Sequence, residues 1–347
     1  MTTLAGAFTG RTMSERRWVF LVTALLTLIL TGCASSTLQN VSMKRGFNVM
    51  QHASMSWEDP QALRSLEQMR SIGSNAVVLV AFLKQSRADS VDVERSGAVS
   101  FEQLEKAIAY ARELGLYTVL KPQILVPGSW AGAINPGRPE AWRQWFKSYS
   151  RQIIAFARFA SQQRVQALVI GTELVHARDK VAWPELIGQV RKVFSGKITY
   201  AAHNVEGIKT FPYWSMLDVV ALTLYPSLGS SGSIKNMQLH VDQAVTRLHQ
   251  AVAAYHKPLW VLEFGMPSAR GASARPWEWQ GLQHARVDLG LQKEALNIWL
   301  HALDKPWING AFIWVWYSDY KAGTLNNADY TPQNKPAECM IRRYWQY

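Results

Sequence analysis

Two glutamates stand out because each follows a short apolar run. Residues 165–172 read Val-Gln-Ala-Leu-Val-Ile-Gly-Thr and lead directly into Glu173, and residues 259–262 read Leu-Trp-Val-Leu and lead into Glu263. Runs of this length and β-branched content are typical of strands buried on both faces. Two acids at buried strand ends suit glycosidic cleavage, in which one acid protonates the leaving oxygen and the other attacks the anomeric carbon. We therefore predict one reaction centre with both glutamates, rather than two N-caps or surface ion pairs.

Polar and aromatic side chains follow the other apolar runs of the chain. Amides and aromatic rings are the groups that commonly orient and stack on sugars. The candidates at these ends are Asn48, Gln51, His52, Lys121, Gln123, His203, Asn204, Tyr225, Trp316, Tyr317 and Asp319. Three tryptophans in expected loops, Trp130, Trp277 and Trp279, are further candidates for stacking on sugar faces.

Eight short apolar runs alternate with amphipathic segments, which indicates how these residues are positioned. Strands are expected at residues 46–49, 76–82, 117–120, 165–172, 198–202, 219–224, 259–262 and 311–315. Helices are expected at residues 60–72, 101–114, 139–162, 183–194, 237–255, 283–303 and 336–344. The second helix follows a capping box, Ser100 with Gln103, and the third has proline in its first turn.

This alternation predicts an α/β fold in which helices cover a parallel sheet. Eight strand and helix units predict a (β/α)8 TIM barrel, where the carboxyl ends of all strands meet at one mouth. The alternative, an open doubly wound sheet, lacks a glycine-rich phosphate loop after the first strand. The fifth unit is the shortest, because only the segment between residues 202 and 219 separates its strand from the next.

Glutamates at the ends of the fourth and seventh strands make the chain similar to the large superfamily of retaining TIM-barrel glycosidases. Three motifs, Gly-Thr-Glu-Leu at 171–174, Leu-Glu-Phe-Gly at 262–265 and Phe-Ile-Trp-Val-Trp at 312–316, most resemble glycoside hydrolase family 113. The known activity of that family is on β-1,4-mannan. The resemblance covers roughly residues 46–347.

The resemblance implies a role for each matching residue. Glu173 would be the proton donor, Glu263 the nucleophile and Tyr225 the tyrosine that hydrogen-bonds the nucleophile. Trp314 or Trp316 would form the floor of the sugar site, and strand alternation alone leaves that choice open. Many relatives have asparagine before the proton donor, where it contacts the sugar 2-OH, but this chain has Thr172, which leaves open the preference between manno- and gluco-configured sugars.

The retaining mechanism sets two expectations for the glutamate pair. Their carboxyl groups should lie about 5 to 5.5 Å apart, a separation that leaves no room for a water to attack the substrate directly and so requires a covalent glycosyl-enzyme. The proton donor needs a raised pKa, and the negative charge of Glu263 is expected to supply it for Glu173.

Other functions are weighed against this one. A metal-dependent hydrolase would need a His-x-His or similar ligand set, and none of the eight histidines forms such a pair, so neither a metal nor a cofactor is expected. A polysaccharide-binding lipoprotein that has lost turnover is the alternative from another class. A barrel glycosidase acting on β-glucan or on an envelope exopolysaccharide is the alternative substrate assignment.

Composition limits the remaining classes. The chain has 347 residues, of which 48% are hydrophobic, and this is enough for one large domain, expected to be a monomer. Its two cysteines are Cys33 and Cys339, which exclude a cysteine metal site. The net charge of +12 favours anionic neighbours such as lipopolysaccharide, but no run of five like charges occurs, so nucleic-acid binding is not expected.

The first residues are typical of a secretory signal. A basic segment at 13–17 precedes an apolar run of twelve residues at 19–30, which is too short for a stable membrane span. Leu-Thr-Gly-Cys at 30–33 resembles the lipobox of bacterial lipoproteins, which implies acylation of Cys33, and Ala34 implies sorting to the outer membrane. We expect a signal peptide at 1–33, a tether at 34–45 and the barrel at 46–347, with translation starting at Met1 or Met13.

Overall fold

The barrel domain is seen in a computed structural model that describes residues 43–346. The predicted signal peptide, Cys33 and most of the predicted tether lie outside the described residues. The first strand begins at Lys44, where its backbone N–H donates to the Asn309 carbonyl at 2.9 Å. Lys44 and Arg45, which we predicted as the end of the tether, therefore belong to the barrel because they pair with the last strand.

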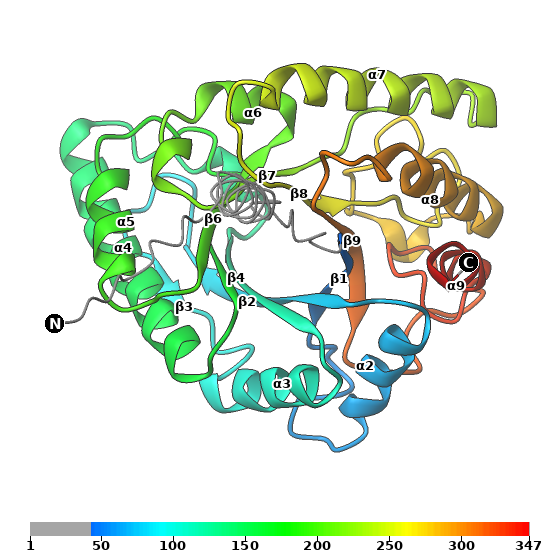
Figure 1. Ribbon diagram of the computed structural model, residues 1–347, viewed down its shortest axis with the longest axis horizontal. Helices are drawn as coiled ribbons and strands as arrows, with labels where there is room; N and C mark the ends of the chain where they lie inside the picture. Colours follow the sequence, from blue (N-terminus) through cyan, green and yellow to red (C-terminus); the bar gives the residue numbers. More distant parts are fainter. Residues whose placement is uncertain (1–42, 347) are drawn as a thin grey trace, which may run out of the picture. The chain divides into compact units, whose positions relative to one another are not determined.

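Eight parallel strands form a closed barrel with helices around it (Figure 1). The strands are β1 (Lys44–Met50), β2 (Ala76–Lys84), β4 (Tyr117–Leu125), β5 (Ala167–Thr172), β6 (Lys197–His203), β7 (Val220–Thr223), β8 (Leu259–Phe264) and β9 (Gly310–Tyr317). The barrel is closed because β1 pairs in parallel with both β2 and β9. The predicted TIM barrel is confirmed, and the open doubly wound sheet is excluded. A two-residue strand, β3 (Glu94–Arg95), pairs antiparallel with the end of β2.

The seven predicted helices occur in the predicted order, and a further short helix, α6 (Asn204–Thr210), follows β6, where no helix was predicted. The other helices are α2 (Ala62–Ser71), α3 (Phe101–Glu113), α4 (Pro139–Gln162), α5 (Trp183–Arg191), α7 (Ile234–Val252), α8 (Leu289–Leu303) and α9 (Pro336–Gln346), with short 3-10 turns η1 (Ala131–Ala133), η2 (Trp214–Met216) and η3 (Leu282–His284). Within residues 43–346 no helix is both long and apolar enough to cross a membrane.

Local signals explain where two helices begin. Ser100 caps α3 through its hydroxyl, which accepts from the Gln103 N–H at 3.2 Å, while the Gln103 side chain accepts from the Ser100 N–H at 2.9 Å, so the predicted capping box is formed. Helix α8 begins at Leu289, later than predicted, because Asp288 caps it by accepting from the Leu291 N–H at 2.9 Å.

Alternate residues of each strand belong to two different apolar clusters. The inner cluster fills the barrel with residues such as Val78, Val119, Val169 and Leu262. The outer cluster packs the opposite strand faces against the helices. Nearer the carboxyl ends of the strands the buried residues include polar ones, Asn48, Lys121 and Glu263, so the barrel interior is apolar at one end and polar at its mouth.

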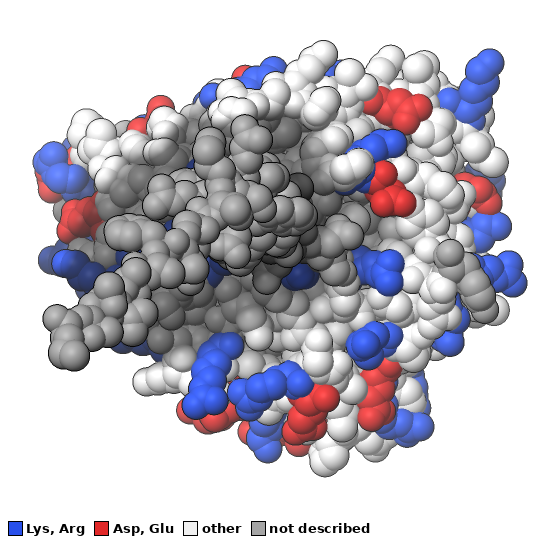
Figure 2. All heavy atoms as spheres, in the orientation of Figure 1, with Lys and Arg blue, Asp and Glu red and all other residues white. Residues whose placement is uncertain are grey.

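Charged side chains of both signs lie on the surface. On the face shown in Figure 2, basic and acidic residues are interspersed around the rim wherever described atoms are visible. Exposed ion pairs, such as Arg275 with Glu278 at 3.1 Å, occur among the described residues.

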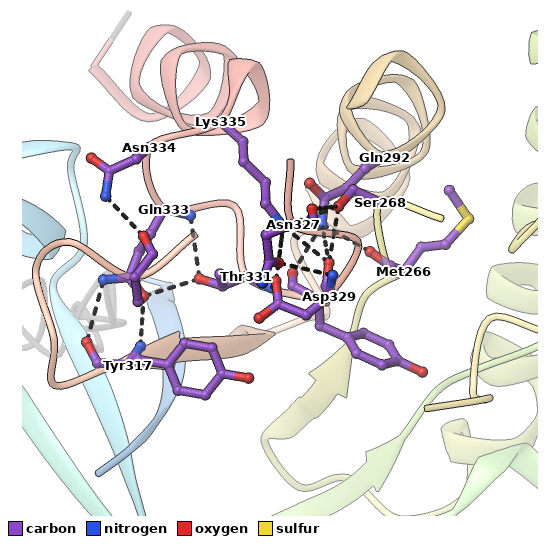
Figure 3. A network of polar contacts seen from close by, with 12 residues as sticks. Met266, Ser268, Gln292, Tyr317, Asn327, Asp329, Thr331, Gln333, Asn334 and Lys335 are labelled. Atoms are coloured by element: carbon purple, nitrogen blue, oxygen red, sulfur yellow. Dashed lines mark hydrogen bonds and ion pairs between the residues drawn. The ribbon is translucent and has the colours of Figure 1, made fainter. Parts of the chain in front are cut away.

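A polar network fastens the segment after β9 to the loop after β8 (Figure 3). The buried Lys335 ammonium donates to Asp329 Oδ1 at 2.8 Å and to the Ser268 hydroxyl at 3.0 Å. The Gln292 side chain of α8 donates to the carbonyls of Met266 at 3.1 Å and Tyr330 at 3.0 Å. The two loops next to Glu263 are thus held by buried hydrogen bonds.

Candidate active site

Glu263 reaches the barrel mouth through an irregularity in β8. Leu262 belongs to the inner cluster and Phe264 to the outer one, so the strict alternation of the strand is broken between them. The pairings of β8 with both neighbouring strands shift at this point. Such a bulge can re-aim a side chain. Here it allows Glu263 to follow Leu262 into the barrel.

The Glu263 carboxylate has a partner for each of its oxygens. Oε1 forms an ion pair with the Lys121 ammonium from β4, and Oε2 accepts from the Tyr225 hydroxyl at 3.2 Å. The Lys121 side chain is fully buried, and its ammonium lies 4.9 Å from the centre of the Trp314 ring. Burial raises the pKa of Glu263 and the charge of Glu173 adds to this, so its pKa is above the usual value although Lys121 opposes the shift. Burial lowers the pKa of Lys121.

Glu173 follows β5 directly, in a left-handed backbone conformation with φ of 54°. Its Oε1 accepts from the Thr223 hydroxyl at 2.5 Å and lies 3.0 Å from Nδ1 of His203. The Asn204 side chain orients that imidazole: its Oδ1 accepts from the Tyr225 N–H at 3.0 Å, which turns its amide nitrogen toward His203 Nε2 at 3.1 Å. This network assigns Nε2 as an acceptor and Nδ1 as the donor to Glu173.

The electrostatics of Glu173 differ from the prediction. Burial acts to raise its pKa, but the hydrogen bonds from His203 and Thr223 and the charge of Lys121 outweigh it, so the pKa is lowered. The predicted rise was wrong because it considered only the charge of Glu263 and left out His203 and Thr223, whose contacts with Glu173 lower its pKa. In the free protein the carboxyl group with the raised pKa is therefore Glu263.

Trp314 lies at this site and Trp316 does not. Trp314 lies beside Lys121, whereas the Trp316 indole N–H donates to the Ser65 hydroxyl of α2 at 2.8 Å and its ring packs on Phe47. The two tryptophans are two residues apart, but the pairing of β1 with β9 shifts between them, which turns Trp316 toward the helices. Trp316 is therefore a core residue, contrary to our inclusion of it among the sugar-binding candidates.

Two further predicted residues are buried beside the glutamates. The Asn48 amide donates to the Leu262 carbonyl at 2.7 Å, next to the bulge that carries Glu263. Thr172 is 3% exposed, and its hydroxyl has no hydrogen-bond partner among the described residues. Asn48 thus supports the glutamate strand, whereas Thr172 makes no comparable contact.

Sequence reasoning missed the contacts of Thr223 and Trp130 with this centre. Thr223 ends β7 and donates to Glu173, and the only signal for it is its inward position two residues before Tyr225. The Trp130 ring, from the loop after β4, lies 4.9 Å from the His203 ring, centre to centre. The position of Trp130 in a loop was predicted, but its contact with His203 was not.

The site brings together two carboxyl groups, an ammonium and an imidazole. Among residues 43–346, no group of three or more His, Cys, Asp or Glu residues could hold a metal ion. One carboxyl group accepts hydrogen bonds from neutral donors, and the other is paired with an ammonium. In such a pair one group can transfer a proton while the other acts as the nucleophile.

Comparisons with known proteins also indicate a glycoside hydrolase. The model of Glycoside Hydrolase Family 113 matches residues 46–335. A solved GH113 β-1,4-mannanase complex is similar, with 27% identity, a TM-score of 0.77, and coverage of 88% of this chain and 99% of that chain. The GH113 β-mannanase AaManA from Alicyclobacillus acidocaldarius has 25% identity, a TM-score of 0.76, and coverage of 88% and 97%. No curated protein sequence matches the chain.

Proposed function

Because the chain belongs to glycoside hydrolase family 113, we propose that it cleaves β-1,4-linked mannan or manno-oligosaccharides with retention of anomeric configuration. O-glycosyl hydrolase activity follows from the family, and the mannan substrate is suggested by the mannanase structures that the chain resembles. One observation carries the mechanism. Glu173 and Glu263 lie at the ends of the fourth and seventh barrel strands, and a chain of polar contacts through His203, Asn204 and Tyr225 connects them.

The first half-reaction forms a glycosyl-enzyme. Ionised Glu263 attacks the anomeric carbon while protonated Glu173 gives its proton to the glycosidic oxygen, so the bond to the leaving sugar breaks and that sugar departs as an alcohol. In the second half-reaction Glu173, now a carboxylate, takes a proton from water, whose oxygen attacks the same carbon and releases Glu263. Two inversions give net retention.

Lys121 neutralises the single negative charge that the two glutamates share in both steps. Before attack, the ionised Glu263, the protonated Glu173 and the Lys121 ammonium sum to zero. After attack, Glu263 is an uncharged ester and Glu173 is ionised, so the sum is again zero. A fixed cation within reach of both carboxylates therefore serves the ground state and the intermediate, in a buried site where an unbalanced charge is costly.

Tyr225 and Trp314 complete the proposed machinery. The Tyr225 hydroxyl donates to Glu263 Oε2, which keeps that carboxylate from rotating away from the sugar. Trp314 lies beside Lys121 at the inner wall, where its ring would form the floor under the sugar that is attacked. His203, Asn204 and Thr223 hold Glu173 from the other side.

The substitutions Glu173→Ala and Glu263→Ala test the two roles. Glu173→Ala should lose activity on manno-oligosaccharides, because general-acid help is worth about 10² to 10⁴-fold, but should still form the intermediate from an activated aryl mannoside. Glu263→Ala should fail on both substrates. Azide should give the β-mannosyl azide with Glu173→Ala and the α-azide with Glu263→Ala. Azides of the reverse configuration would exchange the roles.

A panel of polysaccharides tests the substrate. New reducing ends should form from β-1,4-mannan, and not from β-glucan, xylan or acidic exopolysaccharide. Proton NMR before mutarotation should show the β-anomer as the first product. Binding of glycan without new reducing ends would favour the non-catalytic alternative, and release from β-glucan or exopolysaccharide alone would change the substrate class.

A further inference from the structure

Trp130 presents an exposed aromatic face next to the side chains that hold Glu173. Its side chain is 41% exposed, a large fraction for an indole, and it lies in the loop between β4 and α4. The ring contacts His203 at 4.9 Å between centres and 55° between planes. Since His203 hydrogen-bonds Glu173, the chain of contacts runs from Trp130 through His203 to Glu173.

The loop is built to hold this ring in place. A Cβ at Gly132 would lie 2.1 Å from Cη2 of the Trp130 indole, so the absence of a side chain there makes room for the six-membered ring. The Ala133 N–H donates to the Trp130 carbonyl at 3.1 Å in the turn η1, and the Asn135 N–H donates to the Ala88 carbonyl at 2.8 Å. The ring is thus seated on a fixed turn with one side open.

The position of the ring relative to the two carboxyl groups indicates which sugar it would meet. During cleavage the acid protonates the oxygen that stays with the leaving sugar, whereas the nucleophile bonds to the sugar that remains. The remaining sugar therefore belongs to the side of Glu263, Lys121 and Trp314. Trp130 contacts His203, a partner of the acid Glu173, so we expect its ring to face the sugar whose oxygen receives the proton, which is the leaving sugar.

We propose that Trp130 forms the binding site for the leaving sugar, stacking on a hexopyranose of a β-linked oligosaccharide. This inference rests on the proposed function. An aromatic face beside a few fixed polar groups is the usual composition of a sugar site, because the apolar C–H face of the ring packs on the indole. Trp130 binds substrate only when the leaving group is itself a sugar.

Two substrates with different leaving groups test this site. β-1,4-Mannotetraose loses a sugar, whereas β-mannobiosyl fluoride loses a single atom that cannot reach Trp130. Trp130→Ala should lower kcat/KM for mannotetraose about tenfold and change that for the fluoride by less than about twofold. Trp130→Phe, which keeps a smaller aromatic face, should recover part of the loss.

Trp307→Ala is the matched control. Trp307 precedes β9 at the amino end of the barrel, away from the mouth, and its ring stacks on His249 at 4.6 Å. This variant should leave the ratio of the two kcat/KM values unchanged. An equal loss of Trp130→Ala on both substrates, or no loss on mannotetraose, would overturn the proposal. A wild-type protein that cleaves the fluoride but no mannoside would instead contradict the proposed substrate, and with it this site.

Discussion

Glu173 and Glu263 have the same chemical type, so the side chains around each of them determine which role it takes. Glu263 lies between an ammonium and a phenol, whereas Glu173 lies between an imidazole and a threonine hydroxyl. In the free protein the pKa of Glu263 is raised and that of Glu173 is lowered. The form that reacts carries its proton on Glu173, and because the two carboxyl groups are coupled, the pH profile reports the pair rather than either residue.

Replacing Lys121 should move the whole pH profile. A positive charge beside a carboxylate lowers its pKa, and Lys121 acts in this direction on both Glu263 and Glu173. Lys121→Met removes the charge while keeping much of the volume, so both pKa values rise. Both limbs of the kcat/KM profile should therefore move to higher pH, and the maximum should fall by about 10²-fold or more because a preorganised charge is lost.

Lys335→Met provides the matched control for this measurement. Lys335 is also a buried lysine with an acidic partner, Asp329, but it lies in the network that fastens the two loops (Figure 3). It should cost stability, since breaking a buried pair costs about 3 to 5 kcal/mol, without moving the pH limbs. An unchanged profile for Lys121→Met, or an equal shift in Lys335→Met, would contradict the role given to Lys121.

At the level of elements, the β8 bulge determines where the nucleophile lies. Asn48 of β1 donates to the Leu262 carbonyl at 2.7 Å, and the Leu224 N–H donates to the Glu263 carbonyl at 2.8 Å. These two bonds hold the backbone on both sides of the shift in register. An irregular strand thus receives from its neighbours the hydrogen bonds that a regular ladder would provide.

Asn48→Ala should therefore impair catalysis more than substrate binding. Freeing the Leu262 carbonyl allows the bulge to shift, and a small displacement of a reacting group is enough to lower kcat about tenfold or more. KM should change little, since Asn48 is fully buried. Kinetics on mannotetraose and thermal unfolding would be measured together.

Asn309→Ala is the control at the other end of the same strand. Asn309 Oδ1 accepts from the Leu259 N–H at 3.0 Å where β8 begins. Loss of that bond should reduce the free energy of unfolding, by about 1 to 3 kcal/mol, but leave kcat unchanged. Equal effects of both substitutions on kcat would show that β8 responds as a whole and that Asn48 has no special role.

The elements were largely predictable from the sequence, whereas the contacts between them were not. Hydrophobic periodicity and caps located the eight barrel strands, the span of α4 and the start of α3, because those signals are local. Strand alternation failed at Glu263 and between Trp314 and Trp316, where the register shifts. Thr223 was missed, and the contact of His203 with Glu173 was not predicted, for a different reason: the two residues come from separate strands whose registers no local pattern fixes.

At the scale of the whole molecule, the barrel and the predicted lipoprotein segment have separate tasks. The barrel, from Lys44 onward, carries the candidate active site, and no helix among residues 43–346 could anchor it by crossing a membrane. We propose that attachment to the cell envelope, with sorting to the outer membrane, is the task of a lipid on Cys33. Enzyme and anchor would then be separable by one substitution.

Cys33→Ser should release the protein from the membrane fraction. The apolar run at 19–30 has twelve residues, which is too few for a stable span, so without acylation nothing in it should retain the chain firmly at a bilayer. Fractionation of cells and labelling with a radioactive fatty acid would measure attachment. Cys339→Ser is the matched control, because Cys339 is an exposed thiol in α9 and should leave both labelling and membrane association intact. Released Cys33→Ser protein should cleave mannotetraose as the wild type does. If it still sediments with membranes, Cys33 is not the anchor, and the apolar run itself holds the barrel at the envelope.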